Sequence, residues 1–248
     1  PDKERFHTSN PEDLLALGDR GADLVAKHLG LRRRKVSYKE LNRDIGQDSI
    51  SHMLLINDFL VMVQGACLAS DGEVRYIPQN EILSQIETKK DLDDPLKIKT
   101  MKGKKMLTTR PDMLFGLQFV NEQEPNKAYF FGEADRGTIT QKNTKKNEKK
   151  KSGWTANYKK YEVYYHWYYN VKGDFKKDYP IENFNFRVLF YTTKDELRAR
   201  NLADVVRDIH PPGKKQWMFA SMQNLKDAEN ILKASWITGT GDSATLMD

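Results

Sequence analysis

Three acidic residues mark one end of a segment that the sequence predicts to be a β-hairpin. Asp112 stands before the first predicted strand, and Glu133 and Asp135 stand at the end of the second. Side chains two residues apart on a strand point to the same face, so Glu133 and Asp135 should share one. With a turn near Glu124, pairing places Asp112 opposite the segment 133–136, where opposed Cβ atoms are about 5 Å apart. The spacing therefore predicts that three carboxylates converge.

Carboxylates at this distance repel, and each raises the pKa of the others unless a divalent cation or basic groups lie among them. Oxygen ligands suit Mg²⁺ or Mn²⁺, which also bind phosphate oxygens. Such a metal can bind a scissile phosphate, activate a water or hydroxyl, and stabilise charge on the leaving oxygen. The alternative is that Asp112 caps a turn and Asp135 pairs with Arg136 or a lysine. The spacing alone leaves both interpretations open.

The strands that should hold these residues are predicted at 113–120 and 127–133, joined by the turn-rich segment 121–126. A shorter strand is predicted at 73–77, before a proline. The segment 89–105 is polar and lysine-rich, so it is expected to be mostly loop.

A long helix is predicted from about residue 50 to residue 69, capped by Ser49. Apolar residues cover most of its circumference, which is typical of a buried helix. Asp58 shares a stripe with Leu54 and Val61 at three- and four-residue spacing, so its carboxylate is expected to point inward. A buried carboxylate needs partners or a metal.

The second half of the chain alternates predicted helices and strands. Tyrosines at helical spacing indicate a helix, and a capping box at Thr193 and Glu196 opens another. The predicted elements are a helix at 153–170, a strand at 186–191, a helix ending near 209, a strand at 216–220 and a helix at 224–232. This order predicts an α/β fold with a central mixed sheet flanked by helices.

Composition limits the class of protein. The 248 residues are 38% hydrophobic and include 11 Phe, 11 Tyr and 4 Trp, enough for one principal globular domain. We expect no membrane span. Cys67 is the only cysteine, so an internal disulfide or a cysteine metal site is excluded and a reducing, cytoplasmic compartment is favoured.

A formal net charge of +6 favours a polyanionic partner. Basic residues gather in two clusters, which suit phosphate contacts. Solvated loops kept open by self-repulsion show the same pattern, so each cluster alone leaves both interpretations open. The candidate DNA-binding residues are Arg32, Arg33, Arg34, Arg136, Lys142, Lys145, Lys146, Lys149, Lys150 and Lys151.

Several short motifs occur in one order along the chain: Arg110-Pro111-Asp112, then the segment 131–138, a helix rich in lysine and tyrosine, the strand 186–193, and Trp236 with 239–242. From about Gly18 to Asp248, this order resembles the replication-relaxation family of plasmids and integrative elements.

The resemblance implies a nuclease-like core similar to the PD-(D/E)XK fold, that is, a restriction-endonuclease-like core related to certain relaxases. It implies a nuclease-like domain at 48–248, preceded at 1–47 by the remnant of a winged-helix DNA-binding region and a linker.

In this family pattern Pro111-Asp112 matches the PD element and Glu133-Ala134-Asp135 matches (D/E)-X-K, with Asp135 where the pattern has lysine. Lys160 is the first candidate to replace that lysine, and Lys159 is the second. The resemblance thus implies Asp112, Glu133, Asp135 and Lys160 as catalytic residues. It implies Asp58, Asp112, Glu133 and Asp135 as ligands of Mg²⁺ or Mn²⁺.

The function expected from the resemblance is that of a cytoplasmic DNA-binding protein of a mobile genetic element, acting in plasmid replication or mobilisation. One alternative is a metal-dependent, relaxase-like endodeoxyribonuclease that nicks DNA, with water or a tyrosine hydroxyl as nucleophile. The other is a catalytically inactive accessory or initiation protein, which the departure at Asp135 keeps open. DNA is the expected partner, together with other replication or mobilisation proteins.

Overall fold

The structure is a computed structural model, which describes residues 19–29, 47–89, 92, 94–120, 126–137, 156–169, 174–182, 184–211 and 213–248. The chain divides into two compact units, Pro1–Leu55 and Ile56–Asp248. The first contains helix α1 (Asp19–Leu29) and the beginning of helix α3 (Gln47–Leu68). The proposed domain boundary between residues 47 and 48 stays a prediction.

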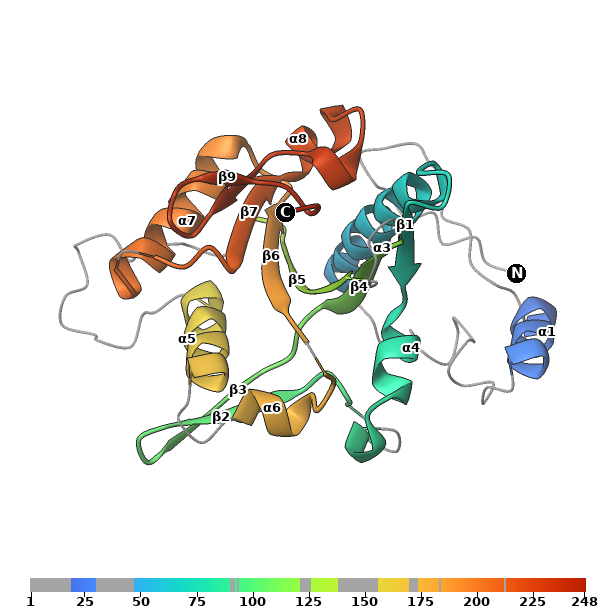
Figure 1. Ribbon diagram of the computed structural model, residues 1–248, viewed down its shortest axis with the longest axis horizontal. Coiled ribbons are helices and arrows are strands. Elements are labelled where there is room, and N and C mark those ends of the chain that lie inside the picture. The colour runs from blue at the N-terminus through green and yellow to red at the C-terminus, as the bar shows by residue number, and fades with distance from the viewer. Residues whose placement is uncertain are drawn as a thin grey trace. The chain divides into compact units, whose positions relative to one another are not determined.

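The second unit is built on a seven-stranded sheet with the order β1-β4-β5-β6-β7-β8-β9 (Figure 1). The strand pairs β5–β6 and β6–β7 are parallel, and the other four pairs are antiparallel. The predicted central mixed sheet flanked by helices is therefore confirmed. The strands are β1 (Val74–Ile77), β4 (Met113–Phe119), β5 (Asn126–Asp135), β6 (Phe186–Thr192), β7 (Trp217–Ser221), β8 (Trp236–Thr238) and β9 (Ser243–Ala244).

The parallel pairs follow from helical crossovers, which neighbouring parallel strands require. Helix α5 (Ala156–Tyr169) lies between β5 and β6 in the chain, and helix α7 (Glu196–Ile209) lies between β6 and β7. The cap of α7 differs from the expected capping box, because Asp195 accepts the Arg198 backbone N–H at 3.0 Å. The Thr193 hydroxyl instead donates to the Arg136 carbonyl oxygen at 3.1 Å.

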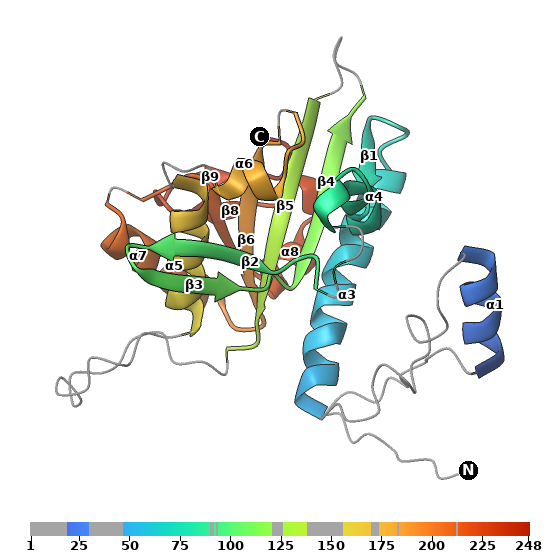
Figure 2. The same cartoon turned by 90° about the horizontal axis from the view of Figure 1, so that it is seen from below.

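Side chains of alternate residues on β5 pack on opposite faces of the sheet. Phe131 contacts Tyr164 and Trp167 of α5, whereas the ring of Phe130 stacks on Phe115, which in turn contacts Phe59 of α3. Figures 1 and 2 show α5 and α7 on one side of the sheet and the later part of α3 on the other. The strand end that carries Glu133 and Asp135 thus faces α5.

Helix α3 is not buried around most of its circumference, contrary to the expectation from its composition. Apart from Ile50, its buried residues form one stripe at four-residue spacing: Leu55, Phe59, Val63 and Cys67. Asp58 precedes Phe59 and lies outside this stripe, so the expectation that its carboxylate points inward is wrong. Its side chain is 55% exposed, with an oxygen 3.9 Å from Lys226 Nζ.

By length and composition, the stretch Ser49–Leu68 of α3 is apolar enough to cross a membrane, which the sequence analysis did not recognise. Its middle residue Phe59 stacks on Tyr191 and meets Trp236 edge-on. The sheet thus covers one face of this part of the helix.

The segment 89–105 contains more regular structure than expected. Strands β2 (Ile98–Lys102) and β3 (Lys105–Thr109) form a separate antiparallel hairpin. Their alternation of buried and exposed residues was concealed by lysines at the exposed positions. The remaining short elements are α4 (Gln79–Ser84), η2 (Glu87–Lys89), α6 (Asp174–Asp178), α8 (Met222–Asp227) and η4 (Ile231–Lys233), the last two replacing the single helix expected at 224–232.

Candidate functional site

The junction of β4 and β5 brings Asp112 beside Glu133. The ladder pairs Met113 with Gly132, so the next position sets Asp112 against Glu133. The Asp112 backbone N–H donates to the Gly132 carbonyl oxygen at 3.0 Å, and the Ala134 backbone N–H donates to Asp112 Oδ2 at 2.8 Å. The prediction that antiparallel neighbouring strands hold these two residues is confirmed.

Glu133 is 2% exposed and is bound by two side chains of α5. The Tyr164 hydroxyl donates to Glu133 Oε1 at 2.7 Å, and Lys160 Nζ donates to Oε2. Lys160 Nζ also lies 3.9 Å from Asp112 Oδ2. Lys160 and Tyr164 reach the same carboxylate because residues four apart on a helix share a face. The ammonium of Lys160 therefore lies between the two acidic residues.

Burial controls the electrostatics of this cluster. Together with the nearby Asp112 charge, it raises the pKa of Glu133 to about 7, against the opposing influence of the Lys160 ammonium. Burial alone lowers the pKa of Lys160, but the attraction of Glu133 and Asp112 outweighs it, so the net shift is upward. Burial, with the neighbouring Glu133, also raises the pKa of Tyr164 well above its usual range. Tyr164 is thus a hydrogen-bond donor at neutral pH, and Lys160 is a cation.

Asp135 shares the face of Glu133, as predicted, but has a different partner. Arg198 of α7 donates through Nε to Asp135 Oδ2 at 2.7 Å and through Nη2 to Oδ1 at 3.2 Å. The Gly137 backbone N–H donates to Oδ1 at 3.1 Å. The two oxygens of Asp135 therefore face a guanidinium fork, and the carboxylate links the end of β5 to α7.

Two residues of this region had no predicted role, Tyr164 and Arg198. Tyr164 could have been found from its spacing to Lys160, four residues earlier on the same helix. Arg198 lies in the first turn of α7, where the helix dipole disfavours a cation. A basic residue at that position is a signal that an acidic partner lies nearby.

A divalent cation can be accommodated by only part of the predicted ligand set. Across the ranges of the chain that the structure describes, no three or more His, Cys, Asp or Glu side chains form a metal-binding group. Asp58 packs on the α3 side of the sheet, and Asp135 is turned to Arg198. Asp112 and Glu133 remain, and Mg²⁺ commonly binds to one or two carboxylates, with waters and substrate phosphates completing its shell. These two residues fit such a site.

Of the predicted DNA-binding residues, the structure describes Arg136, which is half-buried directly after Asp135. Its carbonyl oxygen accepts the Thr193 hydroxyl. The clusters Arg32 to Arg34 and Lys142 to Lys151 lie outside the described residues.

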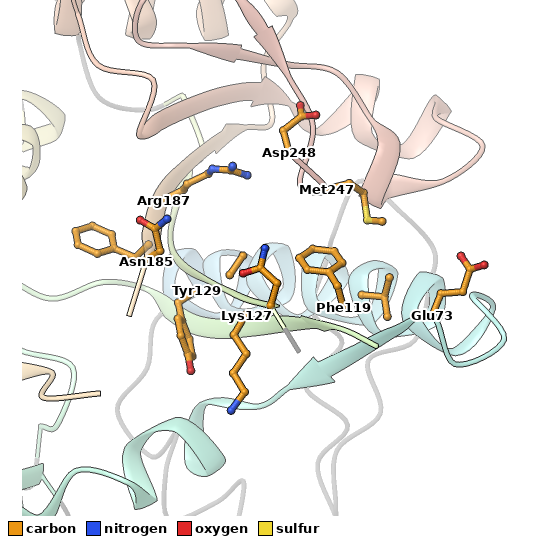
Figure 3. A pocket seen from close by; sticks show the side chains of 12 residues that line it. Glu73, Phe119, Lys127, Tyr129, Asn185, Arg187, Met247 and Asp248 are labelled. Atoms are coloured by element: carbon orange, nitrogen blue, oxygen red, sulfur yellow. The ribbon is translucent and has the colours of Figure 1, made fainter. Parts of the chain in front are cut away.

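A cavity of about 300 Å³ lies at the opposite end of β5 (Figure 3). Its lining includes Lys127 and Tyr129 from the start of β5, Arg187 from the start of β6, and Asp248. Glu133 and Asp135 lie at the other end of β5, so the cavity is separate from the carboxylates.

Comparison of the chain with models of protein families, with curated proteins and with solved structures finds no match in any of the three.

Proposed function

We propose that this protein binds DNA of a mobile genetic element in the cytoplasm and nicks one strand in a reaction that depends on Mg²⁺ or Mn²⁺, during plasmid replication or mobilisation. The observation that carries the proposal is the position of Lys160, whose ammonium lies between Asp112 and Glu133 at the β4–β5 junction. Two acidic side chains with a lysine suit phosphodiester chemistry, because they can bind both a hard cation and a phosphate oxygen.

The elements around the cluster support a restriction-endonuclease-like core. Helix α3 is followed by the antiparallel strands β1, β4 and β5, then by the crossover helix α5 and the parallel strand β6. Asp112 precedes β4, Glu133 lies in β5 and Lys160 lies in α5. We propose that Lys160 takes the role of the lysine that the motif lacks at Asp135. The winged-helix remnant at 1–47 belongs to the same proposal.

Each residue of the cluster has a distinct part in the proposed reaction. A bound divalent cation would supply Lewis acidity at the scissile phosphate and lower the pKa of an attacking water. Asp112 and Glu133 hold that cation, and the hydroxyl of Tyr164 fixes the orientation of Glu133. In the free protein Lys160 neutralises the two carboxylates. In the complex with DNA its charge is available to a phosphate oxygen.

The tyrosines that the structure describes around the cluster favour water as the nucleophile. Tyr161, Tyr164 and Tyr191 are almost completely buried. Burial raises the pKa of each, which disfavours the phenolate that would attack phosphorus. Their hydroxyls are therefore poorly suited to a covalent link with DNA.

The proposal is tested by incubating pure protein with supercoiled plasmid and Mg²⁺ or Mn²⁺ and measuring nicked circles. Lys160→Met should remove nicking. Lys159→Met is the matched control, since Lys159 is the exposed neighbour on α5, and it should nick as the wild type does. Equal loss in both variants would contradict the role given to Lys160.

A second function has one observation in its favour. Each carboxylate of the region already has a bond within the protein: Asp112 with Ala134, Glu133 with Lys160 and Asp135 with Arg198. This is the state expected of an accessory or initiation protein that binds DNA without cutting it. This alternative would be established if the wild-type protein binds plasmid DNA but neither nicks it nor binds Mn²⁺.

A further inference from the structure

The hairpin formed by β2 and β3 has the charge of a nucleic-acid-binding element. From Lys97 to Arg110 the sequence contains no acidic residue and six basic ones: Lys97, Lys99, Lys102, Lys104, Lys105 and Arg110. All six are exposed. Such a density of positive charge on one short element is suited to phosphate contacts.

The tip of the hairpin combines these charges with apolar side chains. Met101 and Met106 are directly opposed in the ladder and are 45% and 62% exposed. Lys102 and Lys105 form the next pair, and Gly103, with a φ of 60°, begins the two-residue turn. A glycine at this position gives a tight turn whose twist matches that of the strands. Because successive pairs point to opposite faces, the tip presents the two methionines on one face and Lys102 and Lys105 on the other, with Lys104 in the turn.

The other face of the hairpin is fixed to the domain. Ile98 and Thr100 are buried, and the Thr100 hydroxyl donates to Asp174 Oδ2 of α6 at 3.0 Å. Lys102 Nζ pairs with Glu162 of α5. Figure 2 shows the hairpin crossing α5, the helix that also carries Lys160. The exposed face is therefore held in a constant position.

The hairpin leads directly into the carboxylate cluster. Strand β3 ends at Thr109, and only Arg110 and Pro111 separate it from Asp112. Five strand residues span about 17 Å, so the tip lies roughly that far from the hairpin base. This is about half of the 34–36 Å helical repeat of B-DNA. A duplex held at Asp112 with its axis along the hairpin would therefore offer a groove near the tip.

We infer that the β2–β3 hairpin is a DNA-contacting arm, whose lysines bind backbone phosphates while Met101 and Met106 enter the major groove. A two-stranded ribbon fits the major groove of B-DNA, and apolar side chains there contact thymine methyl groups. The inference rests on the proposed function, since it takes DNA as the partner. It adds an element in a segment that was expected to be mostly loop.

The charge of the arm is tested by fluorescence anisotropy with a labelled duplex of mixed sequence, in EDTA, over a series of KCl concentrations. Lys104→Gln with Lys105→Gln should weaken binding and reduce the slope of log affinity against log salt by about 1.8, since each lost phosphate contact removes about 0.9. The control is Lys226→Gln with Lys233→Gln, which removes the same charge from exposed positions on α8 and η4. Equal slopes in the two double variants would overturn the inference.

The groove contact is tested by a second pair of variants. Met101→Ser with Met106→Ser should lower affinity several-fold and leave the salt slope unchanged, whereas Met101→Leu with Met106→Leu should bind as the wild type does. Wild-type affinity in the serine variant would show that the tip does not enter a groove.

The wild-type protein separates this inference from the proposed function. If it fails to bind duplex DNA, the proposed function fails, and the arm with it. If it binds and the lysine variants match the control, only the arm is wrong. Catalysis is measured separately, by the nicking of supercoiled plasmid, and is not inferred from the two binding experiments.

Discussion

Two acidic residues on one face of β5 have different partners, although only one residue separates them. Asp135 is held by the guanidinium fork of Arg198. Glu133 is held by a single ammonium, that of Lys160, and by the hydroxyl of Tyr164. Burial raises the pKa of Glu133 to about 7. Both carboxylates are almost completely buried, so the difference lies in their partners.

The comparison shows how neighbouring ion pairs can serve different purposes. A planar arginine fork matches both carboxylate oxygens and fixes their geometry. A lysine is a point charge on a flexible stem and can exchange one carboxylate for another anion. We therefore assign the Asp135–Arg198 pair to stability and the Glu133–Lys160 pair to the reaction.

The largest effect on stability is expected for Arg198→Ala. Removing one partner of a buried ion pair leaves the other charge uncompensated, which costs about 3–5 kcal/mol. Thermal or urea unfolding measures the loss. Arg200→Ala is the matched control on the same helix, because Arg200 pairs with Glu196 at the surface, where solvent screens the pair and its loss should change stability little. Similar losses in both variants would remove the distinction between the two regions.

In the region assigned to the reaction, Asp112→Asn and Glu133→Gln should each abolish nicking. Each amide keeps the size of the side chain and removes the charge that would hold the metal. A loss of at least about a hundredfold, or about 2.7 kcal/mol of transition-state stabilisation, is expected. Plasmid nicking measures the rate, and anisotropy should show that most DNA affinity remains. Nicking within a few-fold of the wild type would contradict the assignment of these ligands.

The sequence predicted much of this arrangement because it depends on local periodicity. The alternation along β5 and the turn-rich connection were sufficient to place Asp112 near Glu133, whereas Lys160 was indicated by the resemblance to the family motif. The departure at Asp135 was visible in the sequence, but its partner was not. Arg198 is 63 residues away in the chain, and only the parallel crossovers bring the two together.

Helix α3 shows why the prediction for Asp58 failed. Apolar residues surround it, so its composition did not reveal which stripe faces the sheet. The stripe containing Phe59 is selected by tertiary contacts with Phe115, Tyr191 and Trp236. The stripe containing Asp58 follows the same spacing and is exposed. Periodicity identifies a helix, but here it did not identify the buried face.

The pKa of Glu133 predicts a pH dependence of metal binding. Below about pH 7 the carboxyl is protonated and does not ligate. Apparent Mn²⁺ affinity, measured by titration calorimetry, should therefore fall about tenfold per pH unit below that midpoint, since binding then requires release of one proton. Glu133→Gln should lose this dependence, and a flat profile in the wild type would contradict it.

The same shift has a consequence for stability, with a definite sign. The folded-state pKa of about 7 lies above the ordinary value of 4.5, so the contribution of Glu133 to stability is present below pH 4.5 and is lost as pH rises through 7. The free energy of unfolding of the wild type should fall over this interval relative to Glu133→Gln.

A smaller effect is expected for Tyr164→Phe. It removes one hydrogen bond to Glu133 and leaves a buried carboxylate oxygen unsatisfied, at a cost of about 1–3 kcal/mol. The hydroxyl also favours the charged form of Glu133, so its loss should raise the pKa and move the midpoint of Mn²⁺ binding to higher pH. A purely structural tyrosine would lower the melting temperature without moving that midpoint.

The smallest effect is expected for Asp58→Asn, which separates the two faces of the sheet. The resemblance made Asp58 a metal ligand, yet its exposed carboxylate lies 3.9 Å from Lys226 on the face opposite α5. A surface ion pair contributes about 0–1 kcal/mol, so stability should change little. Nicking and Mn²⁺ affinity should equal those of the wild type, because the proposed ligands are Asp112 and Glu133. A large loss of Mn²⁺ binding in this variant would mean that the site draws ligands from both faces, and the two-carboxylate site proposed for Asp112 and Glu133 would then be incomplete.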